Sequence, residues 1–238
     1  MFLVFDDRPS DSAFVERVWR SHSERAGTFL SVASSHWEMV VTRLRGKTML
    51  TLRGPETRAT SIDCPADGEW VGVRFKLGTF MPRQPVGTLI NRRDVNLPDQ
   101  SGRRFLLDGS AWEYPSFENA ESFVRRLVRA GLVARDPAVE AALQGDTRAL
   151  SARSAQRHFV YATGMTQTTH RKIERARYAV RLLRSGVSIA DTVHEARYYD
   201  QAHLTRALRH LIGETPSRIL HHERQLSFLY KTAPSDAR

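Results

Sequence analysis

The chain has 238 residues, enough for two modest domains or one large one, and its hydrophobic content of 41% is that of a packed globular protein. Its formal net charge of +10 favours a polyanionic partner such as nucleic acid over an anionic membrane surface. The single cysteine, Cys64, excludes an intrachain disulfide and a multi-cysteine zinc site, so we expect a buried structural residue in a reducing compartment.

The N-terminal residues, MFLVFDDRPSD, turn acidic after the first five and lack the basic flank of a signal peptide. No uninterrupted apolar run is long enough to cross a bilayer. We therefore expect a cytoplasmic protein without a membrane partner. The positive charge is uneven, because residues 134–238 hold 17 Lys and Arg against 10 Asp and Glu, whereas residues 1–133 hold 19 against 16. A nucleic acid is therefore expected to bind the C-terminal part.

Residues 1–112 are predicted to form a β-rich domain. Short apolar runs alternate with turns, the runs being residues 39–41, 49–52 and 70–75 and the turns residues 45–47, 54–55 and 66–68. This spacing is typical of a small barrel or sandwich. Residues 78–98 contain three prolines and two glycines, which predicts a long loop with one helical turn and a candidate gate for a ligand.

The β-rich domain also contains many aromatic residues, and apolar and aromatic side chains usually dominate small-molecule sites. Most of these aromatic residues are expected to fill the core. Trp37 is the strongest exception, because a strand residue inside a barrel can face a cavity. We therefore predict a ligand site that includes Trp37, Trp70 and Phe75.

From Ser116 the hydrophobic period changes from two to about three and a half residues, which predicts a helix capped by Ser116. Its apolar stripe comprises Phe117, Ala120, Phe123, Val124, Leu127, Val128 and Leu132. Two roles remain open: the first helix of a DNA-binding domain, which we favour, or a dimerisation helix. The favoured role rests on Asp136 and Pro137, which predict a short supporting helix over residues 138–143.

Residues 151–164 are predicted to form a helix that begins at a Ser151 cap, buries Phe159 and ends at Gly164. Its exposed face carries Arg153, Gln156 and Arg157. Residues 168–185 are then predicted to form a continuous helix of about 16 residues, roughly 24 Å long, that acts as a rigid spacer.

The stretch SIADTVHEARYYDQAHLTRALRHLIGETP, residues 188–216, is predicted to form two short helices joined by a tight corner. Ser188 can cap the first helix and Asp200 the second. In the second helix an apolar stripe recurs at i, i+4, i+7 and i+8, formed by Leu204, Leu208, Leu211 and Ile212. Gly213 and Pro216 end this helix. The pattern predicts a helix-turn-helix with a basic recognition helix.

This stretch resembles the signature of the AraC/XylS family of bacterial transcription activators. The matching residues are Ile189, Ala190, Tyr198, Asp200, Gln201, His203, Leu204, Thr205, Arg206, Leu208, Gly213, Thr215 and Pro216. Residues 151–164 resemble the first of the family's two helix-turn-helix units. One residue departs from the pattern, since the position before the aromatic Tyr198 is usually glycine in the family and is Arg197 here. Either the corner takes an altered path or Arg197 has a positive backbone angle φ and is strained.

The resemblance implies an α+β protein, with a β-rich, cupin-like barrel or sandwich over residues 1–112 and an all-α double helix-turn-helix domain over residues 113–238. It also implies a sequence-specific transcriptional regulator, more often an activator that contacts RNA polymerase than a repressor. The β-rich domain would bind a small effector or mediate assembly.

Double-stranded DNA is the expected partner, a nucleoid-associated location follows from it, and homodimerisation is left open. Matching motif positions and exposed helical faces select the contact residues. The candidates for base contacts are Arg153, Gln156, Arg157, Gln201, His203 and Arg206, and the candidates for phosphate contacts are Lys172, Thr205 and Arg209.

An enzyme is the main alternative, because some cupin-like domains hold a catalytic metal. Such sites need clustered histidines and carboxylates, and this domain offers only His22 and His36, with Glu38 as the nearest carboxylate. We therefore expect no catalytic residue, metal or cofactor. The alternative is an enzyme with a metal-dependent cupin-like β-domain fused to a DNA-binding tail. A non-specific nucleoid or RNA binder is a third hypothesis.

Overall fold

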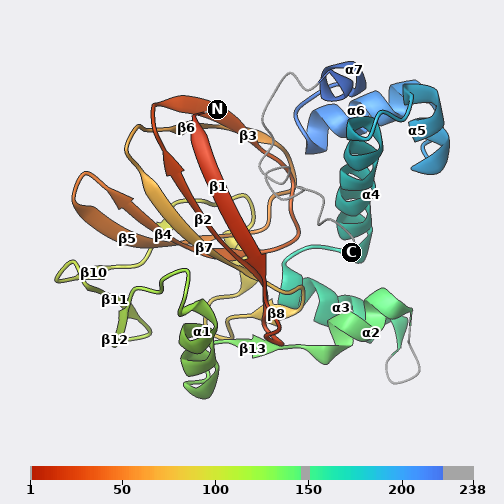
Figure 1. Ribbon diagram of the computed structural model, residues 1–238. Coiled ribbons are helices and arrows are strands. Elements are labelled where there is room, and N and C mark those ends of the chain that lie inside the picture. The colour runs from red at the N-terminus through yellow and green to blue at the C-terminus, as the bar shows by residue number, and fades with distance from the viewer. Residues whose placement is uncertain (1, 146–150, 222–238) are drawn as a thin grey trace, which may run out of the picture. The chain divides into compact units, whose positions relative to one another are not determined.

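The structure is a computed structural model that describes residues 2–145 and 151–221, and most of its helices and strands are labelled in Figure 1. The chain divides into two compact units. Unit 1 comprises Met1–Gly27, Ser35–Pro55 and Pro65–Gln167, and unit 2 comprises Thr28–Ser34, Glu56–Cys64 and Thr168–Arg238. Strands dominate residues 3–113 and helices follow them, so the predicted α+β class is confirmed. The expected domains, residues 1–112 and 113–238, stay a prediction.

A six-stranded antiparallel sheet forms the centre of unit 1. Its strands are ordered β1 (Leu3–Pro9), β2 (Val15–Ser23), β7 (Glu69–Phe75), β4 (Glu38–Leu44), β5 (Lys47–Arg53) and β9 (Val95–Asn96). A two-residue turn joins β4 to β5, and both of its residues have positive φ, 50° at Arg45 and 74° at Gly46. Turns of this kind match the right-handed twist of paired strands, which explains why the chain reverses where the sequence predicts a turn.

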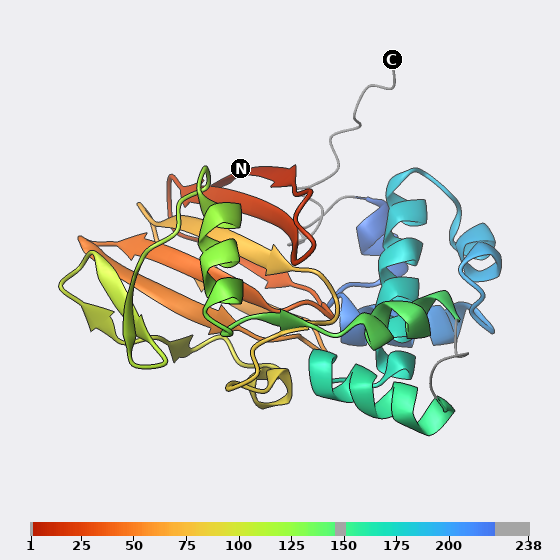
Figure 2. The same cartoon turned by 90° about the horizontal axis from the view of Figure 1, so that it is seen from below.

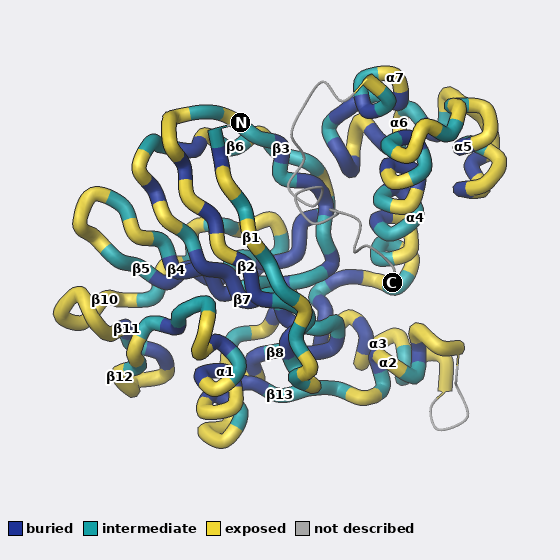
Figure 3. The backbone as a smooth tube through the Cα atoms, in the orientation of Figure 1, coloured by how far each residue is buried: buried dark blue, intermediate teal, exposed yellow. Residues whose placement is uncertain are grey.

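Side chains alternate along the strands, so each face of the sheet carries its own row across the strands. One row is apolar and at most 1% exposed, and it consists of Val18, Val73, Met39 and Leu52. In Figure 3 the buried colour follows these strands through the sheet. The row on the opposite face is charged and consists of Arg17, Arg74, Glu38 and Arg53.

Two of the three residues that the metal alternative would use, Glu38 and His36, have protein partners on β7. Glu38 accepts a hydrogen bond of 2.5 Å from Arg74, and His36 Nδ1 donates to the backbone carbonyl of Phe75 at 2.9 Å. Among residues 2–145 and 151–221, no group of three or more His, Cys, Asp or Glu is placed to hold a metal ion.

Helix α1 (Ala120–Arg129) covers the apolar face of the sheet (Figure 2). Its buried residues belong to the same core as the strands, and they are Ala120, Phe123, Val124 and Leu127. Ser116 does not cap the helix, because its hydroxyl accepts from the N–H of Asn119 in a preceding turn and the helix begins at Ala120. The sheet therefore covers the apolar stripe of α1, and the two roles predicted for this helix, in a DNA-binding domain or in dimerisation, stay predictions.

The segment 78–98 contains one helical turn, η1 (Val86–Leu89), as the sequence predicts. It also contains strand β8 (Thr79–Phe80), which pairs with β13 (Ala134–Arg135). Met81, Val86 and Leu89 are buried in the core of unit 1. A gate in this segment would therefore have to withdraw core side chains. A three-stranded sheet follows, with strands β10 (Asp99–Gln100), β11 (Arg104–Leu107) and β12 (Ser110–Glu113).

In the described residues after β13 the structure contains six helices: α2 (Pro137–Gln144), α3 (Ala152–Thr163), α4 (Gln167–Arg184), α5 (Ile189–Glu195), α6 (Gln201–Leu211) and α7 (Pro216–Leu220). Ser151, Ser188 and Asp200 cap their helices as predicted, each accepting a hydrogen bond from a backbone N–H of the first turn. The predicted spacer is α4, a continuous helix of 18 residues. No helix within the described ranges is long and apolar enough to span a membrane.

Unit 2 also contains two strands that come from the N-terminal half of the sequence. They are β3 (Gly27–Ser31) and β6 (Thr60–Cys64), and they pair with each other. Cys64, at the end of β6, is buried as predicted.

Candidate nucleic-acid interface

Helices α5 and α6 form a helix-turn-helix with a buried stripe and capped ends. Asp200 Oδ1 accepts a hydrogen bond of 2.6 Å from the N–H of His203, which fixes the start of α6. The stripe of α6 is buried as predicted and consists of Leu204, Leu208, Leu211 and Ile212. Gly213 follows with a φ of 84° and lets the chain turn away. The apolar side of α6 is therefore fully used in packing, which leaves its polar side for a partner.

The corner between α5 and α6 contains Arg197, whose φ of 54° lies in the left-handed region. Of the two alternatives, the strained backbone is therefore the one observed. The guanidinium of Arg175, on α4, lies 4.4 Å from the ring centroid of Tyr198 and donates to the carbonyl of Arg197 at 3.4 Å. Burial raises the pKa of the Tyr198 phenol, while Arg175 acts in the opposite direction. Helix α4 thus braces the corner.

Three of the predicted DNA-contact residues are exposed on α6: Gln201, Arg206 and Arg209. Within the described part of the chain, no carboxylate pairs with Arg206 or Arg209. A guanidinium can donate two parallel hydrogen bonds to a guanine edge or a phosphate, and a glutamine can bond adenine in the same way. This face of α6 therefore has the donors that both kinds of DNA contact need.

The other two predicted contacts of α6 are engaged within the protein. Thr205 Oγ1 donates to the carbonyl of Gln201 at 2.8 Å. His203 Nδ1 accepts from the N–H of Tyr199 at 3.5 Å, and its ring stands edge-on to Tyr198 with centroids 5.1 Å apart. A DNA contact by Thr205 would require its hydroxyl to rotate, and the corresponding roles of both residues stay predictions.

Helix α3 presents the remaining predicted base contacts on its exposed side: Arg153, Gln156 and Arg157. Phe159 is 1% exposed and packs with Val139 of α2, as a core anchor is expected to do. His158 Nδ1 lies 2.7 Å from Asp136 Oδ2, which ties α3 to the start of α2. Lys172, the last predicted phosphate contact, is exposed on α4.

Two further exposed residues are missed by the sequence reasoning. Tyr199 is 90% exposed and directly precedes the Asp200 cap, and Arg171 is exposed beside Lys172. Aromatic and arginine side chains are enriched at contact surfaces. The sequence position of Tyr199 could have indicated its exposure. Its neighbour Tyr198 is the aromatic residue that the corner buries, and Tyr199 therefore points away from the core.

The three predicted ligand residues lie in different surroundings. Trp37 and Phe75 are buried in the core of unit 1, where their rings stack with centroids 3.8 Å apart. The indole N–H of Trp37 donates to the carbonyl of Thr79 at 2.7 Å. Trp70 instead lines a groove of about 940 Å³. The structure does not bring the three into one cavity, so a ligand at Trp37 and Phe75 would have to displace packed rings.

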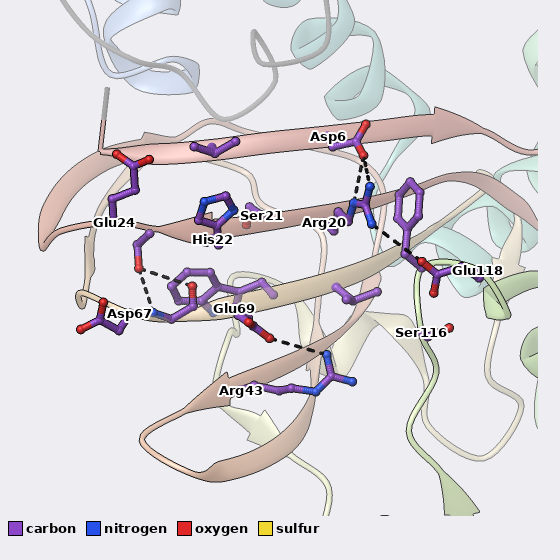
Figure 4. A pocket seen from close by; sticks show the side chains of 16 residues that line it. Asp6, Arg20, Ser21, His22, Glu24, Arg43, Asp67, Glu69, Ser116 and Glu118 are labelled. Atoms are coloured by element: carbon purple, nitrogen blue, oxygen red, sulfur yellow. Dashed lines mark hydrogen bonds and ion pairs between the residues drawn. The ribbon is translucent and has the colours of Figure 1, made fainter.

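The groove that Trp70 lines is drawn in Figure 4. Arg20 donates to Asp6 at 2.9 Å, lies 3.7 Å from Glu118 and stacks over the ring of Phe117 at 4.5 Å. The groove therefore combines paired charges with an aromatic face, a lining that can bind a polar organic molecule.

A family model described as a helix-turn-helix domain matches residues 147–222, a range that includes α3 to α7. The match supports an AraC-like DNA-binding domain in this part of the chain, and with it a DNA-binding transcription regulator. Neither a curated protein nor a solved structure matches the chain.

Arg197→Gly is expected to leave stability unchanged or to raise it by up to about 1 kcal/mol, because glycine adopts positive φ without a steric penalty. Arg197 is exposed, and the bond from Arg175 goes to its backbone carbonyl, which glycine retains. The free energy of unfolding in urea measures the effect. A matched control is Arg209→Gly, an exposed helical position that should lose about 1 kcal/mol. A loss above about 1 kcal/mol at Arg197 would show that its side chain supports the corner.

Proposed function

We propose that the protein is a sequence-specific transcriptional regulator of the AraC/XylS type that reads duplex DNA with α3 and α6. The observation that carries the proposal is the polar face of α6. Gln201 and Arg206 are exposed on this face, the leucine stripe on the opposite side is buried, and Asp200 caps the start of the helix. The helix-turn-helix match over residues 147–222 supports it.

Base and phosphate contacts are divided between the helices. Base edges are read from α3 by Arg153, Gln156 and Arg157, and from α6 by Gln201, His203 and Arg206. Phosphates are bound by Lys172, Thr205 and Arg209, which set the register of the protein on the duplex.

The operator consists of two short blocks. Helix α4 has 18 residues, which corresponds to about 27 Å along its axis. Major-groove positions on one face of B-DNA recur about every 34 Å, or about 10 base pairs. A helix of this length, with some bending of the duplex, suits two recognition helices that enter successive major grooves.

Selection from a randomised duplex library with the purified full-length chain tests this function. The expected result is enrichment of two short blocks whose centres lie about 10 base pairs apart. A non-specific nucleoid or RNA binder would enrich no sequence. Stoichiometric iron or zinc in the purified protein would instead favour the enzyme with a metal-dependent β-domain.

The finer features of the proposal are an activator role through contact with RNA polymerase, a homodimer, and a cupin-like β-domain over residues 1–112 joined to a DNA-binding domain over residues 113–238. Transcription in vitro from a promoter that carries the selected site decides between activation and repression.

The β-rich domain is proposed to sense a small molecule in the groove that Trp70 lines. At least one compound in a thermal-shift screen of small polar organic molecules should raise the melting temperature and change DNA affinity, because a ligand that binds only the folded state stabilises it. Trp70→Ala should abolish the shift, whereas Arg103→Ala, an exposed position outside the groove, should retain it. An equal shift in both variants would place the ligand elsewhere.

A further inference from the structure

The two strands β3 and β6 form a small platform in unit 2, which we term the strand clamp and define as residues 28–34 and 56–64. Ser34 and Glu56 exchange two backbone hydrogen bonds of 2.9 and 2.8 Å. The hydroxyl of Ser31 donates to the Glu56 carboxylate at 2.8 Å. Leu30 is 7% exposed. The two segments of the clamp are therefore joined both by backbone hydrogen bonds and by a side-chain hydrogen bond.

The clamp holds the C-terminal end of α6. The N–H of Ala33 donates to the carbonyl of Leu211 at 2.8 Å, and the N–H of Ala59 donates to the carbonyl of His210 at 2.9 Å. The last four carbonyls of a helix have no partner within the helix. Two of those of α6 are thus satisfied by residues that lie 178 and 151 positions earlier in the chain.

Packing reinforces these bonds at the residue that ends the helix. A Cβ atom on Gly213 would lie 3.1 Å from the Cβ of Ala59 and 3.3 Å from Cδ2 of Leu30. The clamp therefore rests directly against the backbone as it leaves α6. The exposed residues Gln201 and Arg206 lie further towards the N-terminus of α6, outside these contacts.

We propose that the strand clamp positions α6 for base recognition and that Leu30, Ala33 and Ala59 are positioning residues for it. This inference rests on the proposed function. A recognition helix contacts base edges with its N-terminal residues, and bidentate hydrogen bonds tolerate little change in distance or angle. Contacts at the C-terminal end of α6 fix the direction of the helix axis and leave the exposed face that carries Gln201 and Arg206 uncovered.

Two substitutions in the full-length chain weaken the clamp in different ways. Ala59→Pro removes the donated N–H, and Ala59→Ser retains it as a control. Leu30→Ala removes the packing against Gly213, and Leu30→Met largely retains it. Ala59→Pro and Leu30→Ala should each bind the selected duplex about threefold to tenfold more weakly. They should lose discrimination only in the block that Arg206 reads and keep their affinity for random duplexes, and both controls should behave as the wild type.

A measurement on the unmodified protein decides the question even where a variant does not fold. Hydrogen exchange at the amides of Ala33 and Ala59 should slow more with the selected duplex than with a random duplex of equal length. Equal protection by both duplexes, or wild-type discrimination in folded Ala59→Pro and Leu30→Ala, would overturn the inference while leaving the proposed function intact. Absence of any sequence preference in the wild type would reject the proposed function and this inference with it.

Discussion

Arg206→Ala should relax sequence preference in one block of the operator and leave the other block unchanged. Arg206 is exposed on α6, and none of the described carboxylates pairs with it, so its guanidinium is available for a base edge. A bidentate contact to guanine contributes roughly 1–3 kcal/mol of discrimination. Selection from a randomised library with the purified variant should show the enriched base disappear at the positions that α6 reads.

Two matched variants complete this experiment. Arg157→Ala should relax the block read by α3, because Arg157 is exposed on that helix. Arg209→Ala should weaken binding to all sequences about equally and reduce the slope of log affinity against log salt by about one, as expected for the loss of one phosphate contact. The two-block arrangement would be wrong if Arg157→Ala and Arg206→Ala altered the same base positions, or if neither altered any.

Phe123→Ala should cost about 3–5 kcal/mol in the free energy of unfolding. Phe123 of α1 is fully buried in the core of unit 1, where its ring packs edge-on against Phe105 of β11 and Trp112 of β12 with centroids 6.1 and 6.4 Å away. The control is Arg125→Ala on the exposed side of the same helix, which should change stability by no more than about 0.5 kcal/mol. Urea denaturation measures both.

A loss below about 1 kcal/mol for Phe123→Ala would contradict the placement of α1 in this core. The experiment matters because the apolar stripe of α1 was the least informative pattern in the sequence. A helical stripe shows that one side of a helix is buried but does not name the surface that buries it. The sheet and a neighbouring helix satisfy such a stripe equally well, so the stripe alone does not predict that α1 packs on the sheet.

Features that depend on a few adjacent residues could be predicted from the sequence. The caps at Ser151, Ser188 and Asp200 are confirmed, because capping is a bond between a side chain and the next turn of backbone. The buried stripe of α6 is also confirmed, because it follows from helical periodicity alone. Arg197 marks the limit of local prediction. The departure from glycine predicts either an altered corner or a strained backbone, and the sequence does not decide between them, whereas the structure shows a positive φ of 54°.

The parts of the candidate site that depend on distant residues could not be predicted. Trp37 and Phe75 look like ligand residues in a strand pattern, but register places their rings against each other in the core. Likewise, the sequence pattern places His203 on the polar side of α6, and only the folded corner turns its Nδ1 towards the N–H of Tyr199. These outcomes depend on which side chains meet in space, and periodicity carries no information about that.

The origin of the strand clamp bears on how this protein can be cut and recombined. A fragment that begins after the β-rich region would carry α6 without Ala33 and Ala59, so two of its terminal carbonyls would lose their partners. Chimeras that graft the C-terminal helices onto another N-terminal domain would inherit the residues proposed to contact bases but not the hydrogen bonds that the strand clamp makes to the end of α6. On the proposed function, the transferable DNA-reading module is discontinuous, and it includes two short N-terminal segments as well as the helices.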